Sequence, residues 1–184
     1  MKLIKPMLLE QTPVPFDNEA YIFEPKLDGW RVIAYLTSDN TILISRGGLD
    51  ITNKFLELGH MHTCTLMSCV LDGEIVADNG FWAVRKGIGV KYVPFDILEI
   101  DGNSIMDKPL IERKKMLSKA LFPANHSLIS IPYIEKEGSK LFDIAVKQNL
   151  EGIIAKRKTG KYYPGQRSNE WIKIKNPKYI RQKN

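Results

Sequence analysis

The chain has 184 residues, of which 43% are hydrophobic and 26% charged, with a net charge of +6 and a pI near 9.2. This composition is ordinary for a folded globular domain and excludes disordered and collagen-like chains. No apolar run approaches the ~18 residues that span a bilayer, and Lys5, Pro6 and Glu10 interrupt the start before a signal-peptide core could form. We therefore expect a cytoplasmic protein, neither secreted nor bound to a membrane.

The positive charge is concentrated near the C-terminal end. Residues 156–184 contain ten Lys or Arg against the single acid Glu170, a local excess of +9 that leaves the first 155 residues at −3. Four aromatic side chains are interleaved with these cations: Tyr162, Tyr163, Trp171 and Tyr179. Cations mixed with aromatic rings suit phosphates and bases, so the stretch indicates contact with a nucleotide or nucleic acid; a solvated strand face is the alternative.

The two cysteines, Cys64 and Cys69, fit a reducing compartment because their spacing matches no zinc pattern. His60 and His62 lie near Cys64 in the sequence, and a surface loop is favoured there over a metal site.

In chain order, the first predicted strand, Tyr21–Phe23, runs into a charged cluster. The cluster is Glu24-Pro25-Lys26-Leu27-Asp28-Gly29-Trp30-Arg31. A short turn between two strands would place Lys26 at a cleft, where nearby cations or desolvation would favour the proton loss that a nucleophile requires. Asp28 and Glu24 oppose that loss unless a divalent cation neutralises them. A solvated turn with a surface ion pair remains the alternative.

A β-hairpin is predicted next, from Val32–Thr37 and Thr41–Ser45 around a turn of Ser38, Asp39 and Asn40. It ends at Ser45-Arg46-Gly47-Gly48, where the backbone could approach a ligand and Arg46 could reach an anion; a plain hairpin-end loop is equally compatible. A short helix starting at Asp50 and stopping at Gly59 follows.

Two further strands carry candidate site residues. Cys69–Val76 is an apolar run interrupted by acids, and a buried Glu74 would need a partner such as a metal ion or a ribose hydroxyl, whereas an exposed edge strand would need none. After a turn at Asp78–Gly80, the strand Val90–Ile100 carries Phe95, by default a core residue.

The second half of the chain predicts helices at Asp107–Phe122 and Ser139–Asn149, and an edge strand at Leu128–Ile134. A strand from Glu151 to Lys156 follows, and a last strand, Trp171–Lys175, places Lys173 and Lys175 on one face. Because short strands outnumber helices without βαβ alternation, we expect an α+β fold of mainly antiparallel sheets flanked by helices.

Together these segments resemble the adenylation (nucleotidyltransferase) domain of the ATP-dependent DNA ligases, an α+β domain with an ATP-grasp-like fold. The matching motifs are Lys26-Leu27-Asp28-Gly29 with Arg31, Ser45-Arg46-Gly47, Leu71-Asp72-Gly73-Glu74, Phe95-Asp96-Ile97-Leu98, Glu151-Gly152 through Lys156, and Trp171-Ile172-Lys173-Ile174-Lys175. The helix text Pro109-Leu110-Ile111-Glu112-Arg113 is also similar. One such motif is weak, but six in the same order across nearly the whole chain are specific.

The resemblance implies a reaction. Lys26 would attack the α-phosphorus of ATP to form lysyl-AMP and release pyrophosphate. The AMP would then pass to the 5′-phosphate of nicked double-stranded DNA, and the 3′-hydroxyl would displace it to seal the nick. The expected setting is a bacterial, phage or viral cytoplasm, and the expected state is a monomer.

The resemblance also implies roles for individual residues. Nucleotide binding falls to Glu24 at the adenine amino group, Phe95 stacked on the base, Arg31 and Arg46 on the sugar and phosphate side, Glu74 on the ribose, and Lys26, Glu151, Lys173 and Lys175 around the phosphates. Mg²⁺, or Mn²⁺ in its place, would be held by Glu74 and Glu151, with Asp28 as a further ligand. The predicted DNA-phosphate contacts are Lys156, Arg157, Lys158 and Arg167, for which a solvated face is the alternative.

Two departures from the family pattern stand out. The stretch from Phe81 to Tyr92 is shorter and less helical than usual, which puts contacts from it in doubt. A family member continues into an oligonucleotide-binding (OB) barrel of some ~80 residues, but only nine residues follow Lys175. We therefore expect residues 1–184 to be one adenylation domain without the OB-fold domain, dependent on that domain or a partner chain for efficient sealing.

Two alternatives stay open. An RNA ligase or a capping guanylyltransferase carries the same lysine motif, although the Trp171–Lys175 ending and the Pro109–Arg113 helix favour DNA ligase. A non-catalytic nucleic-acid-binding module of the same fold is the other, and the presence of every expected catalytic side chain weighs against it.

Overall fold

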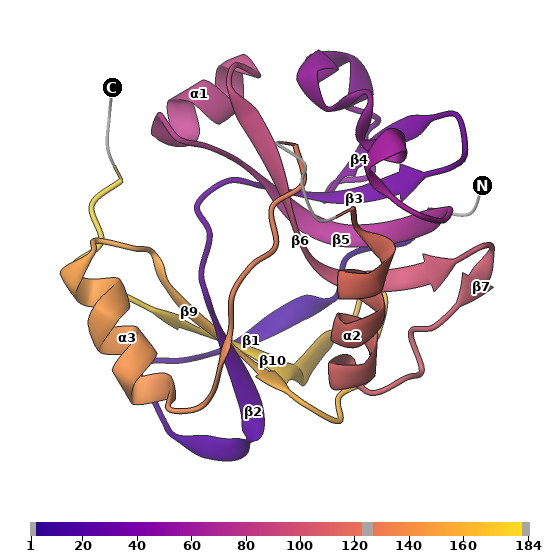
Figure 1. Ribbon diagram of the computed structural model, residues 1–184. Coiled ribbons are helices and arrows are strands. Elements are labelled where there is room, and N and C mark those ends of the chain that lie inside the picture. The colour runs from indigo at the N-terminus through magenta and orange to yellow at the C-terminus, as the bar shows by residue number, and fades with distance from the viewer. Residues whose placement is uncertain (1–2, 123–126, 182–184) are drawn as a thin grey trace.

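The computed structural model describes residues 3–122 and 127–181, which form two five-stranded sheets with helices packed against them (Figure 1). The first sheet contains β3 (Trp30–Leu36), β4 (Thr41–Ser45), β5 (Cys69–Ala77), β6 (Val90–Ile100) and β7 (Asn103–Ser104). The second contains β1 (Leu8–Thr12), β2 (Asn18–Pro25), β8 (Ile134–Lys136), β9 (Gly152–Arg157) and β10 (Arg167–Lys175). The helices are α1 (Gly80–Lys86), α2 (Leu110–Ala120) and α3 (Gly138–Lys147).

The strand orders are β4-β3-β5-β6-β7, here called the β5 sheet, and β1-β10-β9-β2-β8, here called the β9 sheet. In the described part of the chain every ladder is antiparallel except that between β1 and β10. The predicted α+β class with mainly antiparallel sheets is confirmed. Among the described residues, no helix is long and apolar enough to cross a membrane.

Alternation along the strands explains the layers. On β3, Val32, Ala34 and Leu36 point to one side, where they pack with Phe55 and Leu58, while Ile33 and Tyr35 point toward the β9 sheet. A strand buried on both faces reads as a continuous apolar run, which is how 32–36 reads. The two sheets therefore meet face to face, and the segments that leave the sheets at this junction are placed to form a site.

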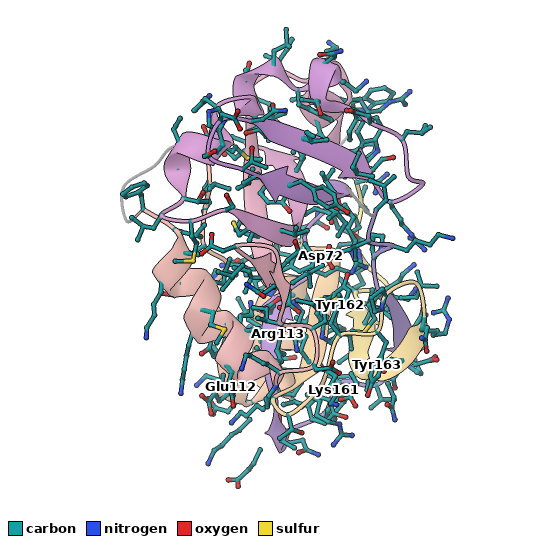
Figure 2. The ribbon with its side chains drawn as sticks, turned by 90° about the vertical axis from the view of Figure 1, so that its right-hand side faces the viewer. Asp72, Glu112, Arg113, Lys161, Tyr162 and Tyr163 are labelled. Atoms are coloured by element: carbon teal, nitrogen blue, oxygen red, sulfur yellow. The ribbon has the colours of Figure 1, made fainter. Side chains whose placement is uncertain are left out.

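Polar side chains also join the two sheets. Arg31 on β3 donates to both carboxylate oxygens of Asp72 on β5, at 3.0 and 2.7 Å. The Tyr162 hydroxyl, from the loop after β9, donates to Asp72 Oδ2 at 2.7 Å and accepts the Met7 N–H at 2.9 Å. Figure 2 shows Tyr162 beside Asp72 at this junction. Because Asp72 is fully buried, this bonding satisfies a charge that would otherwise be costly there.

A second buried ion pair fixes α2. Arg113 donates to both oxygens of Asp96, at 2.9 and 2.7 Å, and to the Gly160 carbonyl at 3.0 Å. Both side chains are fully buried, and Figure 2 shows Arg113 on the inner side of α2. The helix predicted at Asp107–Phe122 is thus held to β6 by charge as well as by Leu110 and Leu117.

Several predicted elements need correction. The helix predicted from Asp50 to Gly59 is instead a pair of one-turn 3₁₀ helices, Thr52–Lys54 and Leu56–Leu58, and a third follows at Met61–Cys64. The predicted strand Leu128–Ile134 pairs only from Ile134 onward, as the short edge strand β8. β1 and α1 were not predicted, since β1 lies in a Pro-rich start and α1 has only seven residues.

Candidate active site

A cavity of about 320 Å³ opens between the two sheets. Its lining includes all nine residues predicted to bind a nucleotide: Glu24, Lys26, Arg31, Arg46, Glu74, Phe95, Glu151, Lys173 and Lys175. They come from β2, β3, β5, β6 and β10, or from the turns beside β2, β4 and β9. The volume lies in the range of about 300–1,000 Å³ that small-molecule sites occupy. The fold therefore gathers residues that are up to 151 positions apart in the sequence, Glu24 and Lys175, into one pocket.

Lys26 lies on the turn between β2 and β3. Its backbone N–H donates to the Gly152 carbonyl at 2.9 Å, and its Nζ lies 2.5 Å from Glu151 Oε2. Gly29 lets the turn pass against β5, because a Cβ there would lie 2.1 Å from the Ile75 carbonyl oxygen. The Lys26 side chain is 20% exposed and lines the cavity beside a carboxylate, a geometry suited to a nucleophile with a proton acceptor.

The inner end of the cavity is built from charges that are matched within the protein. Glu24 is 1% exposed; Lys156 Nζ lies 2.7 Å from its Oε2, and Lys114 of α2 contacts its Oε1. Burial by itself would raise the pKa of Glu24, but the two ammonium groups outweigh burial and hold that pKa below its usual value. Two cations share one carboxylate, so burial and Lys114 together lower the pKa of Lys156 to about 8 in spite of Glu24.

Two aromatic rings form a wall at this inner end. Phe95 and Trp171 meet edge to face, with centroids 5.8 Å apart, and Lys156 Nζ lies 4.3 and 4.1 Å from the two centroids. Arg31 lies against the same rings at 5.5 and 5.6 Å. Phe95 is only partly buried and lines the cavity, so its ring can contact a flat ligand there.

The outer end differs from the inner end in how its cations are paired. Among the residues that the structure describes, Arg46, Lys173 and Lys175 make no ion pair. Partial burial lowers the pKa of Lys173, and the positive charges of Lys175, Arg167, Lys26 and Arg46 lower it further. A set of cations that repel one another in a cleft favours binding of a polyanion.

Glu74 also faces the cavity. Burial raises its pKa to about 8, even though Arg31 and Lys26 act in the opposite direction. Within the described residues its carboxylate has no ion-pair or side-chain hydrogen-bond partner, and no group of three or more His, Cys, Asp or Glu side chains gathers as a metal site. Mg²⁺ commonly uses only one or two carboxylates together with water and substrate phosphates, so Glu74 and Glu151 fit such an ion.

Comparison with known proteins decides the family. The family model for the ATP dependent DNA ligase domain matches residues 6–175. This chain belongs to that family. It is the catalytic adenylation domain of an ATP-dependent DNA ligase, as the six motifs predicted, and the predicted resemblance is confirmed.

Relatives of this ligase domain are longer than the chain. It is 35% identical over 188 residues to the SPbeta prophage-derived DNA ligase-like protein LigB of Bacillus subtilis, covering 96% of this chain and 68% of that protein. It is 28% identical over 200 residues to DNA ligase C1 of Mycolicibacterium smegmatis, covering 94% of this chain and 56% of that protein. The mycobacterial DNA ligase D complexed with ATP and MES has a TM-score of 0.80 and 28% identity, over 94% of this chain and 60% of the other.

The four predicted DNA contacts fall in three places in the ligase domain. Lys156 is 2% exposed and lies inside the cavity against Glu24, so it does not reach the surface where a DNA backbone would lie, and that prediction is corrected. Arg157 pairs with Glu170 at 3.2 Å, and Lys158 pairs with Glu135, both on the exterior. Arg167 lies at the cavity mouth, where it donates to the Leu9 carbonyl.

Asp28, predicted as a further metal ligand, does not line the cavity. Its carboxylate accepts hydrogen bonds from the Tyr179 hydroxyl at 2.6 Å and from Arg181 at 2.9 and 2.5 Å. The carboxylate is therefore occupied by donors from the chain itself, and only Glu74 and Glu151 remain as ligand candidates.

Sequence reasoning missed Lys114, Tyr179 and Arg181. The sequence pattern of 107–122 predicts a helix without assigning Lys114 a role, yet Arg113 and Lys114 both fall at buried positions of that helix. Charged residues at such positions are almost never fully buried without a partner, and that signal could have identified Lys114. Tyr179 and Arg181 belong to a basic tail in which no local pattern distinguishes one cation from another.

Proposed function

We propose that this domain adenylates itself, using ATP to form a phosphoramidate between AMP and Lys26 Nζ. The observation that carries the proposal is the position of Lys26 Nζ between an aromatic inner end and a mouth of unpaired cations. The likeness to a mycobacterial ligase D complexed with ATP supports it. In this step a bond forms between Nζ and the α-phosphorus, the bond from that phosphorus to the bridging oxygen breaks, and pyrophosphate leaves.

Glu151 is placed to receive the proton that Lys26 must lose. Its Oε2 lies 2.5 Å from Nζ, within the distance that a general base needs. Lys173 and Lys175 face the same mouth and would stabilise the negative charge that builds on the phosphates. Arg46, from the hairpin end, would contact the phosphate side as well.

The inner end would bind the nucleoside. Glu24 accepts hydrogen bonds and would take the adenine amino group, while Phe95 would stack on the base. Glu74 would bind the ribose, and Arg31 would line the sugar side. Lys156 joins the nucleotide site in this proposal rather than the DNA surface, because it is buried against Glu24.

Mg²⁺, or Mn²⁺ in its place, would be held by Glu74 and Glu151. When bound, such an ion neutralises phosphate charge and orients the oxygens. The partly buried Glu74 carboxylate has no ion-pair partner within residues 3–122 and 127–181, which supports this assignment, since a cation would remove the cost of ionising it.

We also propose the two later steps of the reaction, transfer of AMP to DNA and sealing of the nick. AMP would pass to the 5′-phosphate of nicked double-stranded DNA, and the 3′-hydroxyl would displace it. Arg157, Lys158 and Arg167 remain the proposed DNA contacts, since each lies outside the cavity or at its mouth. We propose a monomer that acts in the cytoplasm, consistent with two free, buried cysteines.

The test is the intact mass of the purified chain after incubation with ATP and Mg²⁺. We expect the mass of one adenylate on the wild type, its loss on adding pyrophosphate, and no gain in Lys26→Ala.

GTP in place of ATP tests the capping alternative, and nicked RNA in place of nicked DNA tests the RNA ligase alternative. Labelling that persists in Lys26→Ala would refute the nucleophile assignment and favour a binding module. We also expect this 184-residue chain to seal nicked DNA slowly; rapid sealing would contradict the proposed need for an OB-fold domain or partner.

A further inference from the structure

The segment 176–181, which follows β10, returns to the turn that carries Lys26. Asp28, two residues after Lys26, receives three hydrogen bonds from this segment: one from Tyr179 Oη at 2.6 Å, and two from Arg181, Nε at 2.9 Å and Nη2 at 2.5 Å. The Asp28 side chain is 17% exposed and Arg181 is 48% exposed. The contact therefore lies at the surface, outside the cavity.

The same segment also holds the loop that carries Glu151. The Asn176 side chain donates to the Leu150 carbonyl at 3.0 Å, and the Asn176 N–H donates to the Glu151 carbonyl at 3.0 Å. Asn149 and Ile180 exchange two hydrogen bonds, at 3.0 and 3.1 Å. The loop before β9 is thus bonded to segment 176–181 at three successive residues.

A third contact joins segment 176–181 to helix α1, which follows β5 of the β5 sheet. The Arg181 guanidinium carbon lies 4.2 Å from the centroid of the Phe81 ring on α1, which follows β5. Figure 1 shows the C-terminal end of the described chain passing between α3 and α1. Segment 176–181 therefore touches three parts of the site's frame: the Lys26 turn, the Glu151 loop and α1.

The proposed proton transfer depends on the 2.5 Å contact between Lys26 Nζ and Glu151 Oε2. Its two residues lie on different loops, each next to the end of the β2–β9 ladder, whose pairing reaches Pro25 and Ile153. Beyond that ladder, the Lys26 N–H donates to the Gly152 carbonyl. A displacement of about 1 Å in a reacting group can cost on the order of 100-fold in rate. An additional link between the two loops that leaves the cavity free would limit such displacement.

We propose that Tyr179 and Arg181 are positioning residues for self-adenylation: by binding the Asp28 carboxylate they hold the Lys26 turn against the Glu151 loop. This inference rests on the function proposed above. Neither residue lines the cavity, so they act on the placement of the nucleophile and not on ATP binding. Asp28 accordingly serves as the attachment point for segment 176–181 and not as a metal ligand.

The test compares Tyr179→Phe, Arg181→Ala and their combination with Arg181→Lys and with the control Lys178→Ala. Lys178 is an exposed neighbour whose side chain makes no ion pair among the described residues. Adenylate formation is followed by intact mass in a single turnover over a range of ATP concentrations. We expect the double variant to lower the maximal rate by at least about tenfold. The half-saturating ATP concentration should stay within about twofold, as expected for a group acting only on the reacting geometry. Arg181→Lys should keep part of the rate, and Lys178→Ala should match the wild type.

A second measurement does not depend on catalysis. Hydrogen exchange of the Lys26 amide, which is bonded to Gly152, should be faster in Arg181→Ala and in the double variant than in Lys178→Ala. Unchanged exchange together with an unchanged maximal rate would overturn the inference, as would an effect confined to half-saturation by ATP. If the wild type does not take up adenylate, the proposed function fails; faster exchange would then still support the structural link, and unchanged exchange would refute it.

Discussion

The charged side chains at the two ends of the cavity differ in whether they have an ion-pair partner within the protein. At the inner end, Glu24 is buried between Lys114 and Lys156, and every charge has a partner within the protein. At the outer end, Lys173 and Lys175 are partly or fully exposed and, within the described residues, have no acidic partner. The inner charges are satisfied by folding, whereas the outer charges can be satisfied only by a ligand.

This difference indicates that the charges at the inner end contribute to stability and those at the outer end to ligand binding. A buried ion pair that loses one partner leaves an uncompensated charge, which is strongly destabilising. Repulsion among exposed cations lowers the free energy of unfolding slightly, and binding of an anion raises it again. Substitutions at the inner end should therefore damage the fold, and substitutions at the outer end should damage only ligand binding.

The largest expected effect is on the stability of Glu24→Gln. Loss of this carboxylate leaves Lys114 and Lys156 without their counter-charge, and we expect the free energy of unfolding at pH 7 to fall by about 3–5 kcal/mol. Urea unfolding monitored by circular dichroism measures it. The conservative control is Lys175→Gln, an exposed substitution at the outer end, which should leave the urea midpoint nearly unchanged.

The pH dependence of that loss has a defined sign. The pKa of Glu24 is lower in the folded protein than its ordinary value of 4.5, so the unfolded chain binds the proton more readily. Its contribution to stability is therefore fully present above about pH 4.5 and is lost as the pH falls through the folded pKa. The difference between wild type and Glu24→Gln should shrink as the pH is lowered from 5 to 3. A difference independent of pH would mean that the ion pairs are not its source.

The sequence predicted the outer end of this comparison better than the inner end. Lys173 and Lys175 follow from strand alternation, because a period of two places both on one face whatever the rest of the chain does. The nine cavity residues were predicted from the resemblance of six motifs to the DNA ligase family, and the structure brings them together. What spacing could not supply was which of them would be paired, since Glu24, Lys114 and Lys156 come from β2, α2 and β9.

The fold shows the same limit. The central strands of both sheets and the helices α2 and α3 were predicted because each buries one periodic face. β1 was missed because its pairing is with β10, more than 150 residues away, and its own residues are only partly buried. Lys156 was assigned to the surface because it lies in a basic stretch, although strand β9 turns it inward toward Glu24. Long-range pairing leaves no local signal in either case.

The next effect should appear in ATP binding and not in stability. Lys173→Gln and Lys175→Gln each remove one cation from the mouth, and a hydrogen bond to a charged group contributes about 1.5–3 kcal/mol. We expect the half-saturating ATP concentration for adenylation to rise by at least about tenfold in each variant. The melting temperature should stay the same or rise slightly, because repulsion among Lys173, Lys175 and Arg46 is relieved. A lower melting temperature with unchanged ATP dependence would reverse the comparison between the two ends.

The smallest expected effect concerns Glu74, which lies between the two ends. Its pKa in the folded protein is raised to about 8 by burial, so the folded state binds the proton more tightly than the unfolded chain. Wild-type stability should consequently fall as the pH rises from about 4.5 to 8, and Glu74→Gln should not share that fall. We expect the variant to gain at least ~1 kcal/mol relative to the wild type between pH 5 and pH 8, since one pKa unit corresponds to ~1.4 kcal/mol.

Adding Mg²⁺ to the stability measurement on Glu74→Gln tests whether Glu74 binds the ion. If Glu74 and Glu151 hold the ion, Mg²⁺ at pH 8 should raise the melting temperature of the wild type and reduce or remove the advantage of Glu74→Gln. Asp28→Asn serves as the matched control, because Asp28 is bonded to Tyr179 and Arg181 and its loss should leave the Mg²⁺ response intact. If Mg²⁺ stabilised wild type and Glu74→Gln equally, Glu74 would not be a ligand of the ion, and its raised pKa would reflect burial in the folded protein alone.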